Sequence, residues 1–218
     1  MSITYRAPRL CGSCGAEVSV LVIESANPTR HPPFQAALLA RTLLRERCPA
    51  CGNVQEHYEK FLWTDLPARL CVAVLRPEWR GDWRLVEADA RTLLVPLRDE
   101  GPQFVRDWNT GVALRVAFGL EELREKVVCR LAGIDDRVLE AIKIERELGD
   151  HHLEAAERGH RLLLARGDGT RELGWAEYQT AAGRDRLAAQ YPGLFGDAVW
   201  VHASRAMQSS APTRPAAS

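Results

Sequence analysis

The sequence predicts an α+β fold in which a cysteine-rich lobe packs on a mixed β-sheet with two central helices. Three observations support this prediction. Two short cysteine motifs lie near the N-terminus, segments rich in valine, isoleucine and leucine follow up to residue 118, and two segments with helical periodicity begin at residue 120. A chain whose strand-like segments mostly precede its helix-like segments is typical of the α+β class.

The two cysteine motifs, residues 10–15 (LCGSCG) and 47–52 (RCPACG), have the spacing of metal-binding knuckles. Within each motif a tight turn directs both sulfurs at one point, and the glycine that follows can adopt a positive φ. Two such pairs supply four thiolates, a donor set typical of zinc. The predicted structural zinc ligands are Cys11, Cys14, Cys48 and Cys51. Four protein ligands leave no position for water or substrate, which argues against metal catalysis.

The segments around the knuckles complete a zinc-ribbon-like lobe over about residues 8–66. Residues 17–24 (EVSVLVIE) predict a strand, and prolines make residues 27–33 an irregular loop. Residues 34–45 have helical spacing and lead into a short strand before Cys48, and residues 54–63 predict a further strand. The loop and helix explain why the knuckles lie farther apart than the roughly 15–20 residues of a minimal zinc ribbon.

The remaining body, about residues 67–205, begins with a strand at residues 69–75 (RLCVAVL) that is apolar enough to be buried on both faces. Residues 77–82 mark a turn. Residues 83–97 fit a helix or a strand equally well, and residues 114–118 predict a strand.

Two helices form the centre of the predicted body. Apolar residues recur at intervals of three or four over residues 120–131, and Gly133 fits a C-terminal stop. Asp135 and Asp136 suit the N-terminus of the next helix, because carboxylates accept from its exposed N–H groups. That helix is predicted to run to Leu148, before Gly149.

The C-terminal part is predicted to contain a hairpin over residues 160–178, a helix near 184–190 and a strand at 198–202. Serine, proline and alanine dominate residues 206–218, which predicts a disordered tail. The whole of residues 1–205 is predicted to form a single domain.

Composition narrows the classes of function. The chain has 218 residues, and its 29 lysines and arginines balance 29 aspartates and glutamates, so no long-range field attracts nucleic acid or anionic membrane. Residues 1–9 lack the apolar core of a signal peptide, and the apolar stretches 18–23 and 34–40 are too short to span a bilayer. We therefore expect a cytoplasmic protein. That compartment keeps thiols reduced and favours a metal over disulfides.

These features together resemble the CpXC domain family of bacteria and archaea. The resemblance rests on the paired CxxC knuckles, the strand that ends at residues 23–27 (IESAN), and residues 121–126 (EELREK) leading into 132–138 (AGIDDRV). It covers most of residues 1–205 and implies that Cys11, Cys14, Cys48 and Cys51 match the family's zinc-binding cysteines. The first knuckle departs from the pattern, because Gly12 stands where the family name leads one to expect proline. The resemblance implies no established activity.

Three other groups of residues are candidates for function. The histidines and acids of residues 150–160 suggest a second metal or an acid/base pair, but their spacing matches no known motif and a solvated linker explains them equally well. The arginines near the first knuckle suggest a phosphate-binding patch, although interspersed glutamates favour a mixed solvated surface. Tryptophans suggest either a recognition surface or core packing. The residues concerned are Asp150, His151, His152, Glu154, Glu157 and His160; Arg6, Arg9, Arg30, Arg41, Arg45 and Arg47; and Trp63, Trp79, Trp83 and Trp108.

The remaining cysteines, Cys71 and Cys129, lie in apolar surroundings and are predicted to be small buried hydrophobes. The leading functional hypothesis is a non-enzymatic zinc-binding protein whose surface binds an unknown protein partner. The alternatives are nucleic-acid binding through the arginines and, with less support, an enzyme that uses residues 151–160. The sequence does not reveal the oligomeric state.

Overall fold

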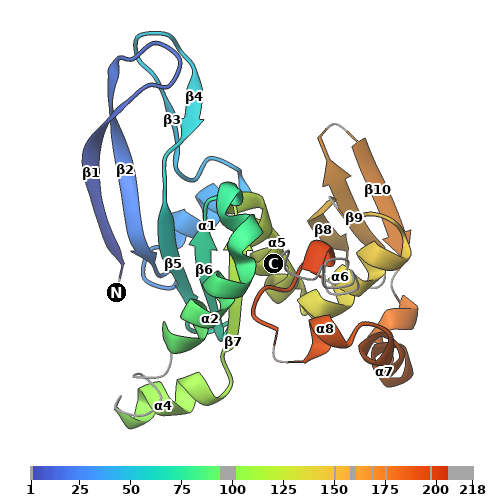
Figure 1. Ribbon diagram of the computed structural model, residues 1–218. Helices are drawn as coiled ribbons and strands as arrows, with labels where there is room; N and C mark the ends of the chain where they lie inside the picture. Colours follow the sequence, from blue (N-terminus) through green and yellow to red (C-terminus); the bar gives the residue numbers. More distant parts are fainter. Residues whose placement is uncertain are drawn as a thin grey trace, which may run out of the picture. The chain divides into compact units, whose positions relative to one another are not determined.

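The computed structural model describes residues 2–93, 102–149, 151–157, 161–167, 169–174, 176–196 and 198–205 (Figure 1). Contacts group the chain into two compact units, residues 1–124 and 125–218, with the boundary inside helix α5 (Leu120–Ala132). The helices and the mixed sheet confirm the predicted α+β class. None of the described helices is long and apolar enough to cross a membrane. The single domain over residues 1–205 stays a prediction, and the tail from residue 206 lies outside the described residues.

A five-stranded sheet in the order β1-β2-β5-β6-β7 forms the framework of the first unit. The pairs β1/β2 and β5/β6 are antiparallel, whereas β2/β5 and β6/β7 are parallel, so the sheet is mixed as predicted. The strands are β1 (Ile3–Leu10), β2 (Glu17–Ala26), β5 (Lys60–Asp65), β6 (Leu70–Leu75) and β7 (Ala113–Phe118). One sheet therefore joins segments expected in the zinc lobe to segments expected in the body.

A second, two-stranded sheet pairs β3 (Arg45–Arg47) with β4 (Val54–Glu56). In Figure 1 it lies near the far end of the β1–β2 hairpin. The predicted strand over residues 54–63 is thus two strands that belong to different sheets. Strand β1 was missed by the sequence reading because it mixes polar and apolar residues and contains Pro8, which is tolerated at the edge of a sheet.

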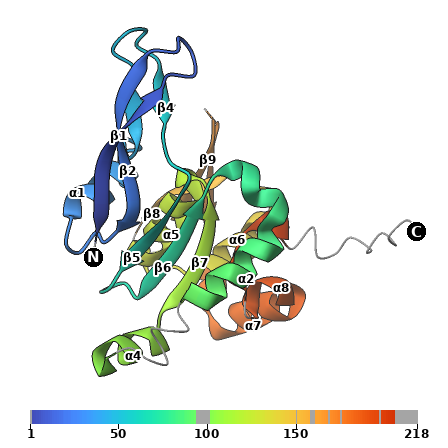
Figure 2. The ribbon, with the colours of Figure 1, turned by 60° about the vertical axis from the view of Figure 1, so that its left-hand side comes forward.

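The helices of the first unit are α1 (Pro32–Leu39), α2 (Trp83–Leu93) and α4 (Gln103–Thr110), and α2 contacts β7 (Figure 2). The predicted helix over residues 34–45 was too long. Arg41 and Leu44 adopt positive φ values of 55° and 57°, which a right-handed helix cannot include. The ambiguous segment from residue 83 is helical through Leu93, and its residues 94–97 lie outside the described part of the chain.

Strand β6 is buried on both faces of the sheet, as predicted for residues 69–75, because its consecutive residues Cys71 and Val72 are both almost fully buried. Phe61 and Trp63 of β5 pair directly with Val74 and Val72 of β6, and all four side chains are buried. Trp83 is buried as well, whereas Trp79 is 43% exposed. Core packing is therefore the correct interpretation for two of the predicted recognition tryptophans and not for Trp79.

The second unit combines helices with a three-stranded antiparallel sheet in the order β10-β9-β8. Strands β9 and β10 form the predicted hairpin, but its second strand ends at Gly174 rather than Tyr178, and Ala176–Gln179 form a 3₁₀ helix. Helix α6 begins after the N-cap Asp135, as predicted, but ends at Glu145 rather than Leu148, and Glu147 has a positive φ of 56°. The elements are α6 (Asp136–Glu145), β8 (His152–Glu157), β9 (Arg161–Arg166), β10 (Gly169–Gly174), α7 (Ala181–Gln190) and α8 (Pro192–Phe195).

The predicted strand over residues 198–202 is wrong. This apolar segment is buried, but it forms no strand in the structure. Side chains hold its backbone instead: Lys126 donates to the Val201 carbonyl, and the Ala203 N–H donates to Glu140 at 2.7 Å. The apolar residues of this segment thus correctly predicted that it is buried, but they did not predict its secondary structure.

Those contacts belong to a buried charge cluster formed by Glu125 and Lys126 of α5 and by Asp136, Glu140 and Lys143 of α6. The Lys143 Nζ atom donates to Glu125 at 3.0 Å and to Glu140 at 2.9 Å. The second oxygen of Glu125 accepts from the Leu153 N–H at 2.7 Å. Lys126 Nζ lies 3.5 Å from Asp136. The cluster fastens α5, α6, β8 and the segment near Val201 to one another.

Glu125 and Glu140 titrate as a coupled pair within this cluster. Burial raises the pKa of Glu125 to about 8. Burial acts on Glu140 in the same direction, but the ammonium groups of Lys143 and Lys126 outweigh it and hold the pKa of Glu140 well below its usual value. One carboxyl proton therefore stays in the pair near neutral pH.

This proton makes stability depend on pH. The folded protein keeps the Glu125 proton up to about pH 8, whereas the unfolded chain releases it near 4.5, so the contribution of Glu125 to the free energy of unfolding falls as pH rises across that window. We expect Glu125→Gln to flatten this decline. Urea unfolding of both proteins across the window measures it, and parallel pH profiles would contradict the assignment.

Candidate metal centre and sheet groove

The two knuckles adopt the same backbone turn. The Gly15 N–H donates to the Cys11 carbonyl and the Gly52 N–H to the Cys48 carbonyl, both at 2.8 Å. Gly15 and Gly52 have φ values of 73° and 75°, in the left-handed region that glycine enters without steric cost. The glycine after each cysteine pair is therefore required by the turn, as the sequence indicated.

Strand pairing places the first cysteine of each knuckle. The Cys11 N–H donates to the Ala16 carbonyl between the end of β1 and the start of β2, and the Cys48 N–H donates to the Asn53 carbonyl between the end of β3 and the start of β4, both at 2.8 Å. Cys11 and Cys48 are buried, and they pack with Val18 and Val20 of β2. Each hairpin thus holds a knuckle at its tip, with a small apolar core beneath the sulfurs.

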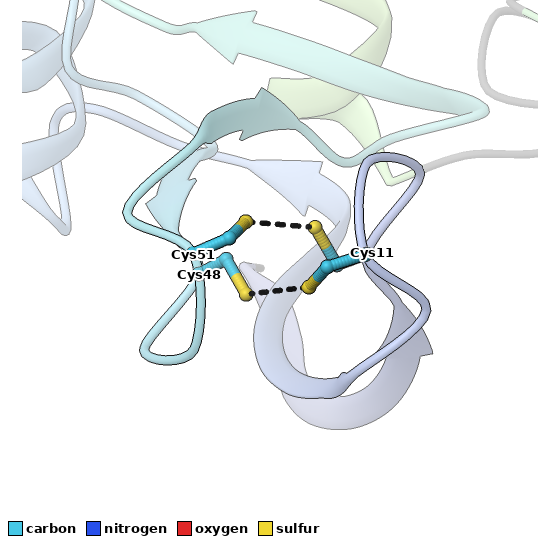
Figure 3. Close-up of side chains that lie close together, drawn as sticks. Cys11, Cys48 and Cys51 are labelled. Atoms are coloured by element: carbon cyan, nitrogen blue, oxygen red, sulfur yellow. Dashed lines mark hydrogen bonds between the residues drawn. The ribbon is translucent and has the colours of Figure 1, made fainter.

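The four predicted cysteines come together in space. Their Sγ atoms all lie within 4.8 Å of one another, and the two sulfurs are 3.7 Å apart both in the pair Cys11 with Cys51 and in the pair Cys14 with Cys48 (Figure 3). A tetrahedron with metal–sulfur distances of about 2.3 Å has edges of about 3.8 Å. The observed separations fit such a tetrahedron and exceed the roughly 2.05 Å of a disulfide. The four thiols could therefore hold one metal ion.

The thiols of the first knuckle differ in acidity. The N–H groups of Ser13 and Cys14 lower the pKa of Cys11 to about 6. The Ala16 N–H also lowers the pKa of Cys14, but the neighbouring sulfur of Cys51, burial and the sulfurs of Cys48 and Cys11 together raise it to about 12. Thiolates packed this closely oppose one another's ionisation, and a bound cation removes that opposition.

Side chains that the sequence reading missed tie the knuckles together. The Gly12 N–H donates to Gln55 Oε1 at 3.1 Å, and Asn53 Nδ2 donates to Ser13 Oγ at 2.7 Å. A proline at residue 12 has no N–H to donate. The departure at Gly12 is therefore accompanied by a hydrogen bond from the first knuckle to β4, the strand that follows the second knuckle.

Most arginines of the suggested phosphate patch contact acidic or backbone groups. Arg41 lies 3.1 Å from Glu121, and Arg45 lies 2.7 Å from Glu56. Arg6 donates to the Ser19 carbonyl at 2.8 Å and lies 3.6 Å from Glu46. Arg47 donates to the Gly52 carbonyl at 2.7 Å. These contacts describe a mixed surface of both charges.

The histidine-rich segment is a strand in its described part, not a helix or a solvated linker. His152 opens β8, and its Nδ1 lies 3.8 Å from a Glu125 oxygen, at the edge of the buried charge cluster. Asp150, His160 and the side chain of Glu157 lie outside the described residues. Cys71 and Cys129 are buried as predicted; burial raises the pKa of Cys71 to about 11 and that of Cys129 well above its usual value.

A groove of about 1010 Å³ opens on the first unit, a feature that sequence reasoning did not find. It arises because β2 and β5 pair only at Ser25 with Leu62 and at Ala26 with Trp63. Along the rest of β2 no strand among the described residues covers this side. The apolar lining includes Val22, Leu62, Ala73, Leu75, Val86 and Ala90, and the aromatic lining includes Tyr5, Tyr58 and Trp79.

Carboxylates outnumber cations along this groove, which from here on is called the sheet groove. Its lining includes five acidic residues, Glu24, Glu56, Glu59, Glu78 and Asp89, against Arg9, Lys60 and Arg76. Arg76 is bonded to Glu78 at 3.2 Å. Burial raises the pKa of Tyr58, and the charges of Glu56 and Glu78 raise it further. Glu56 also contacts Arg45, at 2.7 Å, so Glu56 and Glu78 each have an arginine partner.

The chain was compared with known protein families, curated proteins and solved structures, and one family model matches it. A family model described as CpXC protein matches residues 10–143, a stretch that contains both knuckles and helix α5. No curated protein and no solved structure matches the chain.

Proposed function

The chain belongs to the CpXC family, a family of unknown function, and from this premise we propose that it is a non-enzymatic protein-interaction module stabilised by zinc. The metal centre and the interaction surface have separate roles in this proposal. The metal fastens the knuckles, and the sheet groove receives the partner.

The donor set supports zinc as the metal. Four thiolates in a tetrahedral arrangement favour zinc over magnesium or calcium, which prefer oxygen ligands. The four sulfurs fill the coordination sphere, so the ion has a structural role. All six cysteines are unpaired thiols in the described residues, which suits a cytoplasmic protein.

The observation that carries the proposal is the sheet groove. Pockets that bind small molecules usually enclose most of the ligand, whereas this groove opens to solvent and is bordered by exposed aromatic rings such as Trp79 (43% exposed) and Tyr5 (48% exposed). Aromatic side chains at a surface are typical of residues that anchor protein partners. The floor of the groove is apolar and its rim is charged, as in protein interfaces.

Nucleic-acid binding has less support from the contacts near the knuckles. Arg41 and Arg45, the arginines best placed for a phosphate, both contact Glu121, at 3.1 and 3.8 Å. A nucleic acid would have to displace these carboxylates before it could bind the guanidinium groups. None of the described residues 151–157 lines the sheet groove or the small pocket beside Leu38 and Glu121. Catalysis by residues 151–160 therefore has less support as well.

Photocrosslinking in the native cell tests the proposal. A benzophenone amino acid is placed at Trp79, in the sheet groove, or as a matched control at Leu85, which is 71% exposed on α2 but does not line the groove. We expect one protein to be captured in defined ratio from residue 79 and not from residue 85. No adduct at residue 79, or equal adducts at both residues, would contradict the groove as the interaction surface.

A further inference from the structure

We infer that the sheet groove accepts an extended, cationic segment of the partner protein, which adds as a strand along the free edge of β2; this rests on the proposed function of the groove. Three features of the first unit carry the inference. They are the unpaired edge of β2, the apolar floor, and the excess of carboxylates in the lining.

The pairing of β2 with β1 shows which residues of β2 direct their backbone N–H and C=O groups toward β1 and which direct them away from it. The Cys11 N–H donates to Ala16 just beyond the register pair Leu10 with Glu17, and Pro8, which has no N–H, pairs with Ser19. In an antiparallel ladder, hydrogen-bonded and non-bonded pairs alternate. Ser19 therefore occupies a non-bonded pair.

By the same alternation Leu21 and Ile23 direct their backbone N–H and C=O groups away from β1. On that side β2 meets β5 only from Ser25 onward. The Ser19 carbonyl accepts from the Arg6 side chain, but no strand of the described residues pairs with Leu21 or Ile23 there. Unpaired strand edges of this kind readily accept an added strand.

The floor of the groove suits alternate apolar side chains of such a strand. Leu62 of β5 pairs directly with Ala73 of β6, so the two side chains share a face, and both are only half-buried. Val22 of β2 is half-buried as well and lines the groove. An added strand places every second side chain toward one face, where these residues lie.

The carboxylates of the lining favour basic residues at those positions of the added strand that do not face the apolar floor. Glu24, Glu59 and Asp89 are exposed in the lining, whereas Glu56 and Glu78 contact Arg45 and Arg76. Lysine or arginine on the segment finds carboxylates here, whereas an acidic segment is repelled. The occupant is therefore an extended segment in which basic and apolar residues alternate.

Synthetic peptides test this inference on the full-length, zinc-loaded protein. The probe is a short fluorescein-labelled peptide in which lysine or arginine alternates with valine or leucine, and fluorescence anisotropy measures its affinity. One control peptide replaces the basic residues by glutamate. A second control keeps the sequence but carries N-methyl groups on alternate backbone nitrogens, which removes N–H donors without changing a side chain.

We expect saturable binding of the basic peptide, and affinities at least about tenfold lower for both controls, because the N-methylated peptide loses hydrogen bonds to β2 and the glutamate peptide is repelled by the carboxylates of the lining. Equal affinity of the N-methylated peptide would overturn strand addition. Equal affinity of the glutamate peptide would overturn the charge selection.

A matched pair of variants on β2 locates the site. Glu24 and Glu17 are both exposed on this strand, but only Glu24 lines the sheet groove. Glu24→Gln is expected to weaken the basic peptide several-fold, and Glu17→Gln to leave its affinity unchanged; equal effects would overturn the location. If no basic peptide binds while residue 79 still captures a partner in the cell, the strand inference fails and the proposed function stands.

Discussion

Replacing Cys48 with serine is expected to abolish stoichiometric metal binding and to unfold the part of the first unit that carries the knuckles. Cys48 is buried, and its sulfur lies 3.7 Å from that of Cys14. Structural zinc contributes about 10–16 kcal/mol of apparent binding free energy in small peptides. This is as large as the roughly 5–15 kcal/mol that stabilises an entire domain. Native mass spectrometry measures the metal per chain, and thermal unfolding measures the loss of stability.

The control for this variant is Ser13→Ala. Ser13 lies in the first knuckle and accepts a hydrogen bond from Asn53, but it supplies no sulfur. We expect Ser13→Ala to keep one metal per chain with a small decrease in melting temperature. A Cys48→Ser protein with full metal content and unchanged melting would disprove the assignment of the four cysteines as the metal ligands.

The second large effect is expected in the buried charge cluster of the second unit. Lys143→Met removes the ammonium group that bonds both Glu125 and Glu140, and it leaves the buried Glu140 carboxylate with less compensation. Removing one partner of a buried ion pair typically costs about 3–5 kcal/mol. We expect a loss of this size in the free energy of unfolding, measured by urea denaturation with circular dichroism.

Two further variants show whether the loss of stability comes from the unpaired buried charge or from the removal of a cationic side chain as such. Arg171→Met removes an exposed cation from β10 of the same unit and is expected to change stability by less than about 0.5 kcal/mol. Adding Glu140→Gln to Lys143→Met removes the buried carboxylate that has lost this partner, so the double variant is expected to recover part of the lost stability. A Lys143→Met protein as stable as the wild type would contradict the view that the cluster fastens this unit.

The metal site could be predicted from the sequence because its determinants are local. Each knuckle turn depends on two cysteines and the glycine that follows, and these lie within five consecutive residues. The hydrogen bonds from Gly12 to Gln55 and from Asn53 to Ser13 could not be predicted, because they depend on the position of one hairpin relative to the other.

Helix α5 shows where sequence periodicity is insufficient. Its apolar spacing predicted the helix correctly, and Gly133 ends it with a φ of 71°. An amphipathic helix usually exposes its charged residues, yet Glu122, Glu125 and Lys126 are all buried. Their partners come from distant parts of the chain, such as Arg80 for Glu122 and Lys143 for Glu125. The sequence around α5 therefore does not predict these ion pairs.

The sheet groove was invisible in the sequence for a related reason. Residues 17–24 and 54–63 were both predicted to be strands, but the sequence does not show that β2 and β5 pair over only two residues and then separate. Register and strand order arise from tertiary packing. The interaction surface therefore became apparent only from the arrangement of the strands.

The central claim is that the cysteines form a closed structural site and that the protein acts through its surface. X-ray absorption at the zinc edge of the purified protein tests it most directly. We expect one zinc per chain with four sulfur neighbours at about 2.3 Å and no lighter ligand. A coordination shell that contains an oxygen or nitrogen neighbour in place of a sulfur would reveal an open site and contradict this account.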